Sequence, residues 1–295
     1  MAKATTKTKA KPSSAAESAA KAGGKKVRAK TVPPKPGRAK TAVAGTAVPR
    51  ASSAKTPAKS APPKFDGFPT DFLAFFRELA RHNDREWFAA NKARYLASVQ
   101  QPTLAFIAAM DIPLGRVADC FVADSRPNGG SMFRIYRDTR FGHDKTPYKE
   151  HAACHFRHVA GKDAHAPGFY VHLDPKEIFF GGGIWRPPTP VLQQIREAIV
   201  ADPDRWQDAT RSASFRRRFG TVAGDSLKRP PKGFDPDHPL VEDLKRTSYF
   251  AVQKAEPPAI GTPRFVGEVA RAFEAMAPFM EFLTDALSLP FHLDD

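Results

Sequence analysis

The sequence predicts an α+β fold with N-terminal helices, a central and mainly antiparallel sheet, and C-terminal helices in a single domain. Three observations lead to this prediction. Large rings recur at helical spacing between residues 70 and 100, side chains alternate with a period of two near residue 170, and helical spacing returns after residue 190. Helices and strands that occupy separate blocks of a chain are typical of α+β proteins.

The first helices are expected where rings recur every three or four residues. Thr70 or Asp71 can cap a first helix. Its apolar face would carry Phe72, Phe75, Phe76 and Leu79. A second helix is expected after Asn83-Asp84 and a third after Pro102.

The middle of the chain has the pattern of strands. Residues 169–173 alternate in polarity, Asp174-Pro175 makes a turn, and residues 178–183 end in three glycines, so a β-hairpin is predicted. Residues 132–136 and 154–159 are two further strand candidates.

Helical spacing then returns for the rest of the chain. Pro190 lies near the first turn of one expected helix, and Asp202-Pro203 starts another. A long last helix is expected to open at Thr262-Pro263, and Pro278 should kink it.

The positive charge is concentrated before residue 65. The whole chain has 46 Lys and Arg against 31 Asp and Glu, a net charge of +15. Residues 1–64 hold 16 of the cations and one acid, Glu17, so they carry the full +15, and residues 65–295 are neutral with 30 of each. Every Phe, Trp and Tyr also lies after residue 64. We therefore expect a disordered tail over residues 1–64 and one globular domain over residues 65–295.

The tail repeats Lys with Ala, Thr, Ser and Pro, and its composition resembles the tails of linker histones and of some bacterial histone-like proteins. Dispersed lysines neutralise phosphates and bind nucleic acid without reading its sequence. Non-specific contact with nucleic acid through residues 1–64 is therefore expected, and a solubilising spacer is the alternative.

Cysteine usage and hydropathy predict a cytoplasmic protein. Cys120 and Cys154 are far apart and lack a CxxC partner, which favours a reducing compartment. No apolar stretch follows the basic amino terminus, and no run of 18 apolar residues occurs, so neither a secretory signal nor a membrane span is expected.

Residues 134–149, which we call the charged motif, are the most informative stretch. They read RIYRDTRFGHDKTPYK and contain five cations and two carboxylates interleaved with rings. In one interpretation the cations line a cleft and hold an anionic ligand, while the carboxylates orient them. In the other, each carboxylate pairs with a neighbouring cation, and the ion pairs pin an irregular loop.

The charged motif also carries a family resemblance. Together with Asn83-Asp84-Arg85 before Trp87-Phe88, and with Gly182-Gly183 before Trp185, it resembles a bacterial and fungal family of conserved hypothetical proteins, domain-of-unknown-function family 2461. The resemblance extends over residues 65–289 and omits the tail. It implies a soluble globular domain and assigns no activity or catalytic residue.

Histidines are frequent after the charged motif. His151, Cys154, His155 and His158 have offsets of 3, 4 and 7, so on a helix they would form one stripe that could start a metal site. On a strand the set divides between two faces. The surrounding pattern favours a strand, and neither a metal nor a cofactor is predicted.

Gly181-Gly182-Gly183 has two interpretations. Backbone N–H groups there could cradle a phosphate, but the run lacks the Lys-Ser/Thr that completes a P-loop. A strand end packed closely against Trp185 is the favoured interpretation.

Three functional hypotheses follow. The first is a binding domain with an anion-accepting Arg/Lys cleft. The second is an enzyme acting on a phosphorylated or carboxylated substrate, with Tyr148 or His151 as proton donor or acceptor. The third is a structural or partner-binding protein. The residues expected to meet around the ligand are Arg134, Arg137, Asp138, Arg140, Asp144, Lys145, Tyr148, Lys149, Gly182, Gly183 and Trp185.

Overall fold

The computed structural model describes residues 64–140, 143–161 and 166–293. All of them belong to one compact unit. The expected tail lies outside the described residues except for Lys64, so its boundary and its disorder stay predictions.

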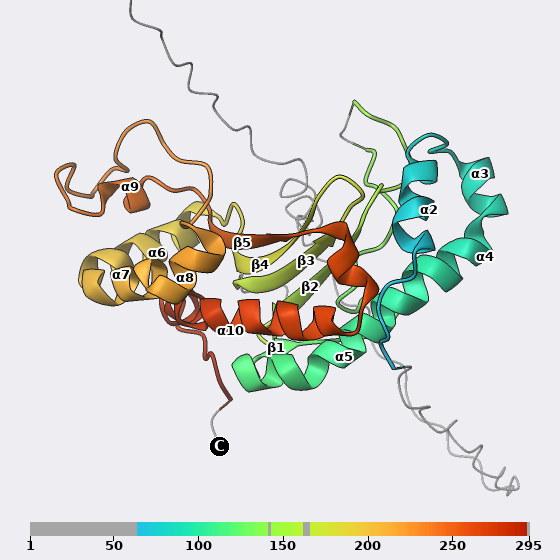
Figure 1. Ribbon diagram of the computed structural model, residues 1–295. Helices are drawn as coiled ribbons and strands as arrows, with labels where there is room; N and C mark the ends of the chain where they lie inside the picture. Colours follow the sequence, from blue (N-terminus) through green and yellow to red (C-terminus); the bar gives the residue numbers. More distant parts are fainter. Residues whose placement is uncertain (1–63, 141–142, 162–165, 294–295) are drawn as a thin grey trace, which may run out of the picture. The chain divides into compact units, whose positions relative to one another are not determined.

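A five-stranded antiparallel sheet forms the centre, and its strands lie side by side in the order of the sequence (Figure 1). They are β1 (Phe121–Val122), β2 (Ala152–His158), β3 (Gly168–Leu173), β4 (Ile178–Ile184) and β5 (Tyr249–Ala255). Helices precede, interrupt and follow the strands, which confirms the predicted α+β class and the mainly antiparallel sheet.

The helices fall into three groups along the chain. Before β1 lie α2 (Asp71–Leu79), α3 (Arg85–Ala90), α4 (Lys92–Tyr95), the π-helical turn η1 (Leu96–Gln100) and α5 (Gln101–Val117). Between β4 and β5 lie α6 (Thr189–Ala201), α7 (Pro203–Arg211), α8 (Ala213–Phe219) and α9 (Val241–Leu244). After β5 lie the 3-10 helix η2 (Pro257–Gly261) and α10 (Arg264–Asp285). Among the described residues, none of these helices is long and apolar enough to cross a bilayer.

Two helices begin directly after an Asp that caps them, as the sequence predicts. Asp84 precedes α3, and its side chain accepts a hydrogen bond from the backbone N–H of Trp87. Asp202 caps α7 in the same way through the N–H of Arg205. Helices also begin close to the other expected positions, 70, 102, 190 and 263, although Thr70 makes no side-chain cap to α2 and α5 already begins at Gln101.

The predicted hairpin is also confirmed. β3 pairs with β4 from Leu173↔Ile178 to Gly168↔Gly183. At the turn between them, the N–H of Asp174 donates to the carbonyl of Glu177 over 3.1 Å. The strand expected near residue 154 is β2, which pairs with β3 in the register Ala152↔Leu173.

Two strand assignments differ from the prediction. Residues 132–136 form no strand, because Met132 makes an isolated bridge to Cys154 whereas Tyr136 makes one to Tyr148. The chain changes partner between these bridges, so no continuous ladder forms. In addition, β5 occurs after four helices, where only helices were expected, and it pairs with β4 along its whole length.

The helix α10 covers one face of the sheet and, with α5, lies on the same side of it (Figure 1). Phe273 of α10 packs against Phe169 at a ring distance of 4.5 Å and against Phe156 at 6.0 Å. The helix continues through Pro278, and its predicted kink stays a prediction.

The glycine run of β4 lets both α10 and β5 approach closely. A Cβ on Gly182 would lie 2.9 Å from Met280 Sδ, and one on Gly181 would lie 1.9 Å from the carbonyl oxygen of Ala251. Trp185 packs against Phe250 of β5 at a ring distance of 5.1 Å. The glycines are therefore needed for packing.

We expect Gly181→Ala to lower the free energy of unfolding by about 1 to 3 kcal/mol, because the new methyl group collides with backbone that cannot rotate away. Gly115→Ala is the matched control, since nothing lies within 4 Å of its Cβ position in α5. It should raise stability by about 0.5 to 1 kcal/mol. Urea unfolding checks both, and equal effects of the two substitutions would contradict the packing role of Gly181.

Candidate functional site

The charged motif folds back on itself beside α3. The N–H of Arg137 donates to the carbonyl of Pro147 over 2.9 Å, and the N–H of Lys149 donates to that of Ile135 over 2.7 Å. The two ends of the motif are thereby joined as a short irregular hairpin. Residues 141 and 142 within it lie outside the described residues.

Asn83 attaches the charged motif to the helical part. Its Oδ1 accepts from the N–H of Tyr148 over 3.1 Å, and its Nδ2 donates to the Tyr148 carbonyl over 3.1 Å and to Glu150 Oε1 over 3.2 Å. The Tyr148 ring stacks on Phe88 at 4.1 Å. Two sequence blocks of the resemblance, residues 83–88 and the charged motif, therefore meet.

Two arginines of the charged motif are each closed by a carboxylate. Arg137 donates to Asp144 over 2.5 Å and also to Thr146 Oγ1, and Arg140 pairs with Asp138 over 2.5 Å. Hydrogen bonds from Thr146, and then the Arg137 guanidinium, lower the pKa of Asp144 to about 2. These pairs fit the interpretation in which the carboxylates pin the loop.

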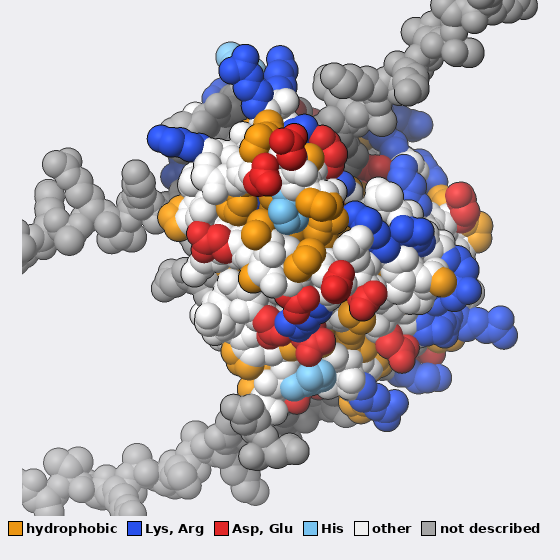
Figure 2. All heavy atoms as spheres, turned by 90° about the vertical axis from the view of Figure 1, so that its left-hand side faces the viewer, with side chains coloured by type: hydrophobic (Ala, Val, Ile, Leu, Met, Phe, Trp, Pro, Cys, Tyr) orange, Lys and Arg blue, Asp and Glu red, His pale blue; other side chains and the backbone are white. Residues whose placement is uncertain are grey.

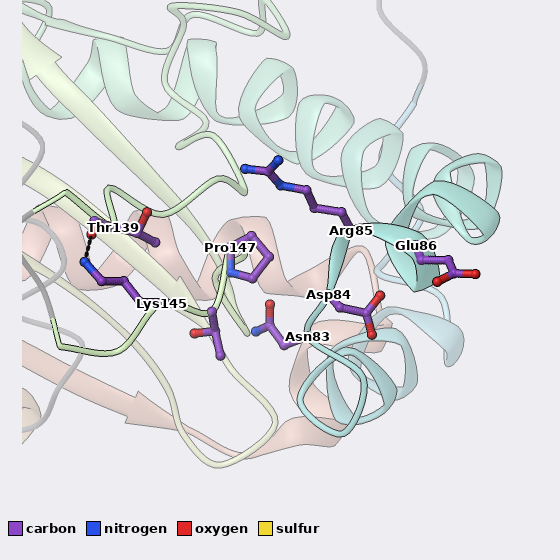
Figure 3. Close-up of a pocket in the computed structure, with 8 residues that line it drawn as sticks. Asn83, Asp84, Arg85, Glu86, Thr139, Lys145 and Pro147 are labelled. Carbon is purple, nitrogen blue, oxygen red and sulfur yellow. Dashed lines mark hydrogen bonds between the residues drawn. The ribbon is translucent and has the colours of Figure 1, made fainter.

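A cavity of about 600 Å³ opens between α3 and the charged motif (Figure 3). It is lined by Asn83, Asp84, Arg85, Glu86, Thr139, Lys145, Thr146 and Pro147. Lys145 Nζ donates to the carbonyl of Thr139 over 2.8 Å. Neither Arg85 nor Lys145 forms an ion pair with a carboxylate in the part of the chain that the structure describes.

The structure does not gather all the predicted ligand residues in this cavity. Of those residues that are described, Lys145 lines it and the others do not. Arg134 lines a second cavity, of about 280 Å³. Lys149 Nζ lies 5.0 Å from the centre of the Phe133 ring, and burial lowers its pKa to about 8. Gly182, Gly183 and Trp185 lie on β4 and just beyond it, where they border neither cavity.

The face of the sheet opposite α10 carries a polar cluster. Phe169 and its alternate neighbours point towards α10, so Tyr170 and His172 point the other way. The His151 and His172 rings lie 4.4 Å apart, and Tyr170 Oη lies 3.1 Å from His172 Nδ1. Potential ligand atoms of His151, His172 and Asp174 all lie within 4.8 Å of one another.

The sequence pattern does not predict this cluster, because the metal stripe that it suggests lies within residues 151–158. Because that segment is a strand from residue 152, the stripe divides between faces. His151 instead meets residues of the neighbouring strand. The antiparallel pairing of residues 152–157 with residues 168–173 brings His151 close to His172 and Asp174, and only a prediction of this pairing could have identified the cluster.

Burial controls the protonation of the cluster. It lowers the pKa of His151 to about 4, with Lys149 and Arg137 as further causes, and it lowers that of His172 to about 3. Burial raises the pKa of Asp174. Both imidazoles are therefore neutral at pH 7.

Tyr148 and His151 were the predicted proton donors or acceptors. Burial raises the pKa of Tyr148, and its ring is stacked on Phe88. His151 is half-buried beside His172. A catalytic role for either side chain stays a prediction.

We expect the domain to lose stability as the pH is lowered, and we expect His155 to cause part of this loss. Burial lowers its pKa from an ordinary value of 6.5 to about 4. Between these values the unfolded chain binds the proton more readily, so stability is lost as the pH falls, by up to about 1.4 kcal/mol per pH unit. Urea unfolding at pH 7, 6 and 5 should show a smaller decrease for His155→Gln than for the unchanged protein. Parallel pH profiles would rule out this contribution.

The family of conserved hypothetical proteins DUF2461 matches residues 71–282. No curated protein and no solved structure matches the chain.

Proposed function

The chain belongs to the DUF2461 family, and we propose that its globular part is a binding domain for a small anionic ligand held between α3 and the charged motif. The ligand class is one that carries a phosphate or a carboxylate. The recognition groups are the side chains of Arg85 and Lys145.

The observation that supports this proposal is the contrast between the cations of one small region. Arg137 and Arg140 are each neutralised by a carboxylate, whereas Arg85 and Lys145 have no such ion pair among the described residues. An Arg guanidinium binds an oxyanion through two parallel hydrogen bonds, and a Lys ammonium adds a point charge. Arg85 and Lys145 thus keep their charge available to a ligand.

Asp84 and Glu86 also line the cavity, so its formal lining charge is zero, and the proposal depends on where these side chains point. The Asp84 carboxylate accepts the N–H of Trp87 as the cap of α3. In Figure 3, Arg85 extends towards the charged motif, while Asp84 and Glu86 point away from Lys145. A volume of about 600 Å³ is also sufficient for a small molecule.

The alternative structural role explains only part of the charged motif. Ion pairs that pin the loop account for Arg137, Asp138, Arg140 and Asp144. They do not account for Lys145, which bonds only a backbone carbonyl in the described part of the chain.

We expect Arg85→Gln and Lys145→Gln each to weaken binding of inorganic pyrophosphate or citrate by at least about tenfold, because each removes a charge-assisted hydrogen bond of about 1.5 to 3 kcal/mol. Isothermal titration calorimetry at fixed ionic strength measures this effect. Arg217→Gln and Lys228→Gln are matched controls, since both side chains are exposed and distant in sequence from the cavity. If the unchanged protein binds neither probe, or if the controls weaken binding equally, the proposal fails.

We further propose that residues 1–64 bring this domain to nucleic acid in the cytoplasm. The support is the distribution of charge, since these residues carry the whole net charge of +15. On the side of the molecule that carries α6 to α9, Lys and Arg gather along one edge and acidic side chains lie among them (Figure 2). The face in view is therefore mixed in charge, and residues 65–295 together are formally neutral.

Deleting residues 1–64 should remove most non-specific affinity for duplex DNA. If about six tail cations neutralise phosphates, the plot of log affinity against log salt should slope at about −5 for the full chain, and the shortened chain should show little slope. Fluorescence anisotropy at several salt concentrations measures both slopes. Equal slopes would transfer the contact to the folded surface, for which the cations of the charged motif, residues 134–149, would be the first to test.

A further inference from the structure

The polar cluster on the sheet face opposite α10 combines His172 of β3 with His151 and Asp174, which lie just outside β2 and β3, and has the donor groups of a metal centre. We propose that His151, His172 and Asp174 bind one divalent first-row transition-metal ion such as Zn²⁺. The proposal rests on side chains other than those of the anion cavity.

The strand register brings the three side chains together. β2 and β3 pair antiparallel with Ala152 opposite Leu173, and His151 and Asp174 are the residues next to this pair, just outside the two strands. His172 lies within β3, and its ring is 4.4 Å from that of His151. The three proposed ligands thus come from the two neighbouring segments of one antiparallel strand pair.

The distances suit a common ion. The potential ligand atoms lie within 4.8 Å of one another. Two ligand atoms bonded to one tetrahedral Zn²⁺ at about 2.1 Å each are about 3.4 Å apart. Side-chain movements of up to about 1.5 Å would therefore complete the site.

The donor set selects the class of ion. Two imidazole nitrogens and one carboxylate oxygen suit Zn²⁺, Fe²⁺, Co²⁺ or Mn²⁺, whereas Ca²⁺ and Mg²⁺ prefer oxygen ligands throughout. Three protein ligands also leave coordination positions for water or for an exogenous molecule.

The neighbours of His172 hold it in a ligand geometry. Its side chain is 1% exposed and stacks on Phe179 at a ring distance of 4.7 Å. Tyr170 Oη contacts Nδ1 over 3.1 Å, which leaves Nε2 for an ion. Such a contact to the second ring nitrogen is the usual support of a metal-binding histidine.

Asp174 is oriented in a similar way. Its Oδ1 accepts from the N–H of Lys176 over 2.7 Å, which leaves Oδ2 for an ion. In the described part of the chain, no hydrogen bond or ion pair joins His151, His172 and Asp174 to one another. Hydrogen bonding among the three therefore does not explain why these side chains gather.

The test uses the full-length protein without a polyhistidine tag, stripped of metal by a chelator and titrated with Zn²⁺ by calorimetry. We expect one equivalent to bind and the thermal midpoint to rise with it. Asp174→Asn and His151→Gln should each weaken Zn²⁺ binding at least about tenfold. His82→Gln is the matched control, because that exposed imidazole lies on the helical side of the domain, beside Trp87.

A second measurement separates metal binding from loss of structure. Asp174 is half-buried at a turn, so Asp174→Asn should stay folded by circular dichroism while losing the Zn²⁺-dependent rise in thermal midpoint. Zn²⁺ binding that is unaffected by Asp174→Asn and His151→Gln, or less than half an equivalent bound by the unchanged protein, would overturn the proposal.

The outcome is also distinguishable from that of the anion proposal. The combined Arg85→Gln and Lys145→Gln variant should bind Zn²⁺ as the unchanged protein does. Loss of Zn²⁺ binding in that variant, with the fold intact, would show that the ion is held at the anion cavity and not on the sheet.

Discussion

The close approach of α10 to β4 is the constraint on which the rest of the structure depends. Gly182 leaves room for the Met276 and Met280 sulfur atoms, where a Cβ would lie about 3 Å from both. Gly181 brings β5 equally close on the neighbouring side. The rings of α10 can then bury against the strands and supply most of the hydrophobic stabilisation of this face.

One side of the sheet is thereby occupied by helices, and the chain can present polar groups on the other. The charged motif lies beside the sheet and is held by Asn83, by the Phe88–Tyr148 stack and by two ion pairs. Both ion pairs are partly exposed, so screening by water and salt limits their effect on stability. The two ion pairs mainly hold the irregular charged motif in one conformation.

Two further groups of side chains carry the proposals for ligand and metal binding. Arg85 and Lys145 border an open cavity, and His151, His172 and Asp174 gather on the sheet face. Burial keeps both histidines neutral, which costs stability on acidification.

The sequence by itself determined the α+β class, the positions of most helices, the β3–β4 hairpin and the separation of charge at residue 64. These depend on local signals, such as Asp84 as a cap and the alternation over residues 169–173. Only the tertiary structure decided that residues 132–136 form bridges instead of a strand, and that β5 returns to the sheet. It also decided that Arg85 and Lys145 line one cavity and that His151 meets His172. Such pairings depend on strand register and on contacts between distant segments, because the same residues can be placed on either face by a shift of one position.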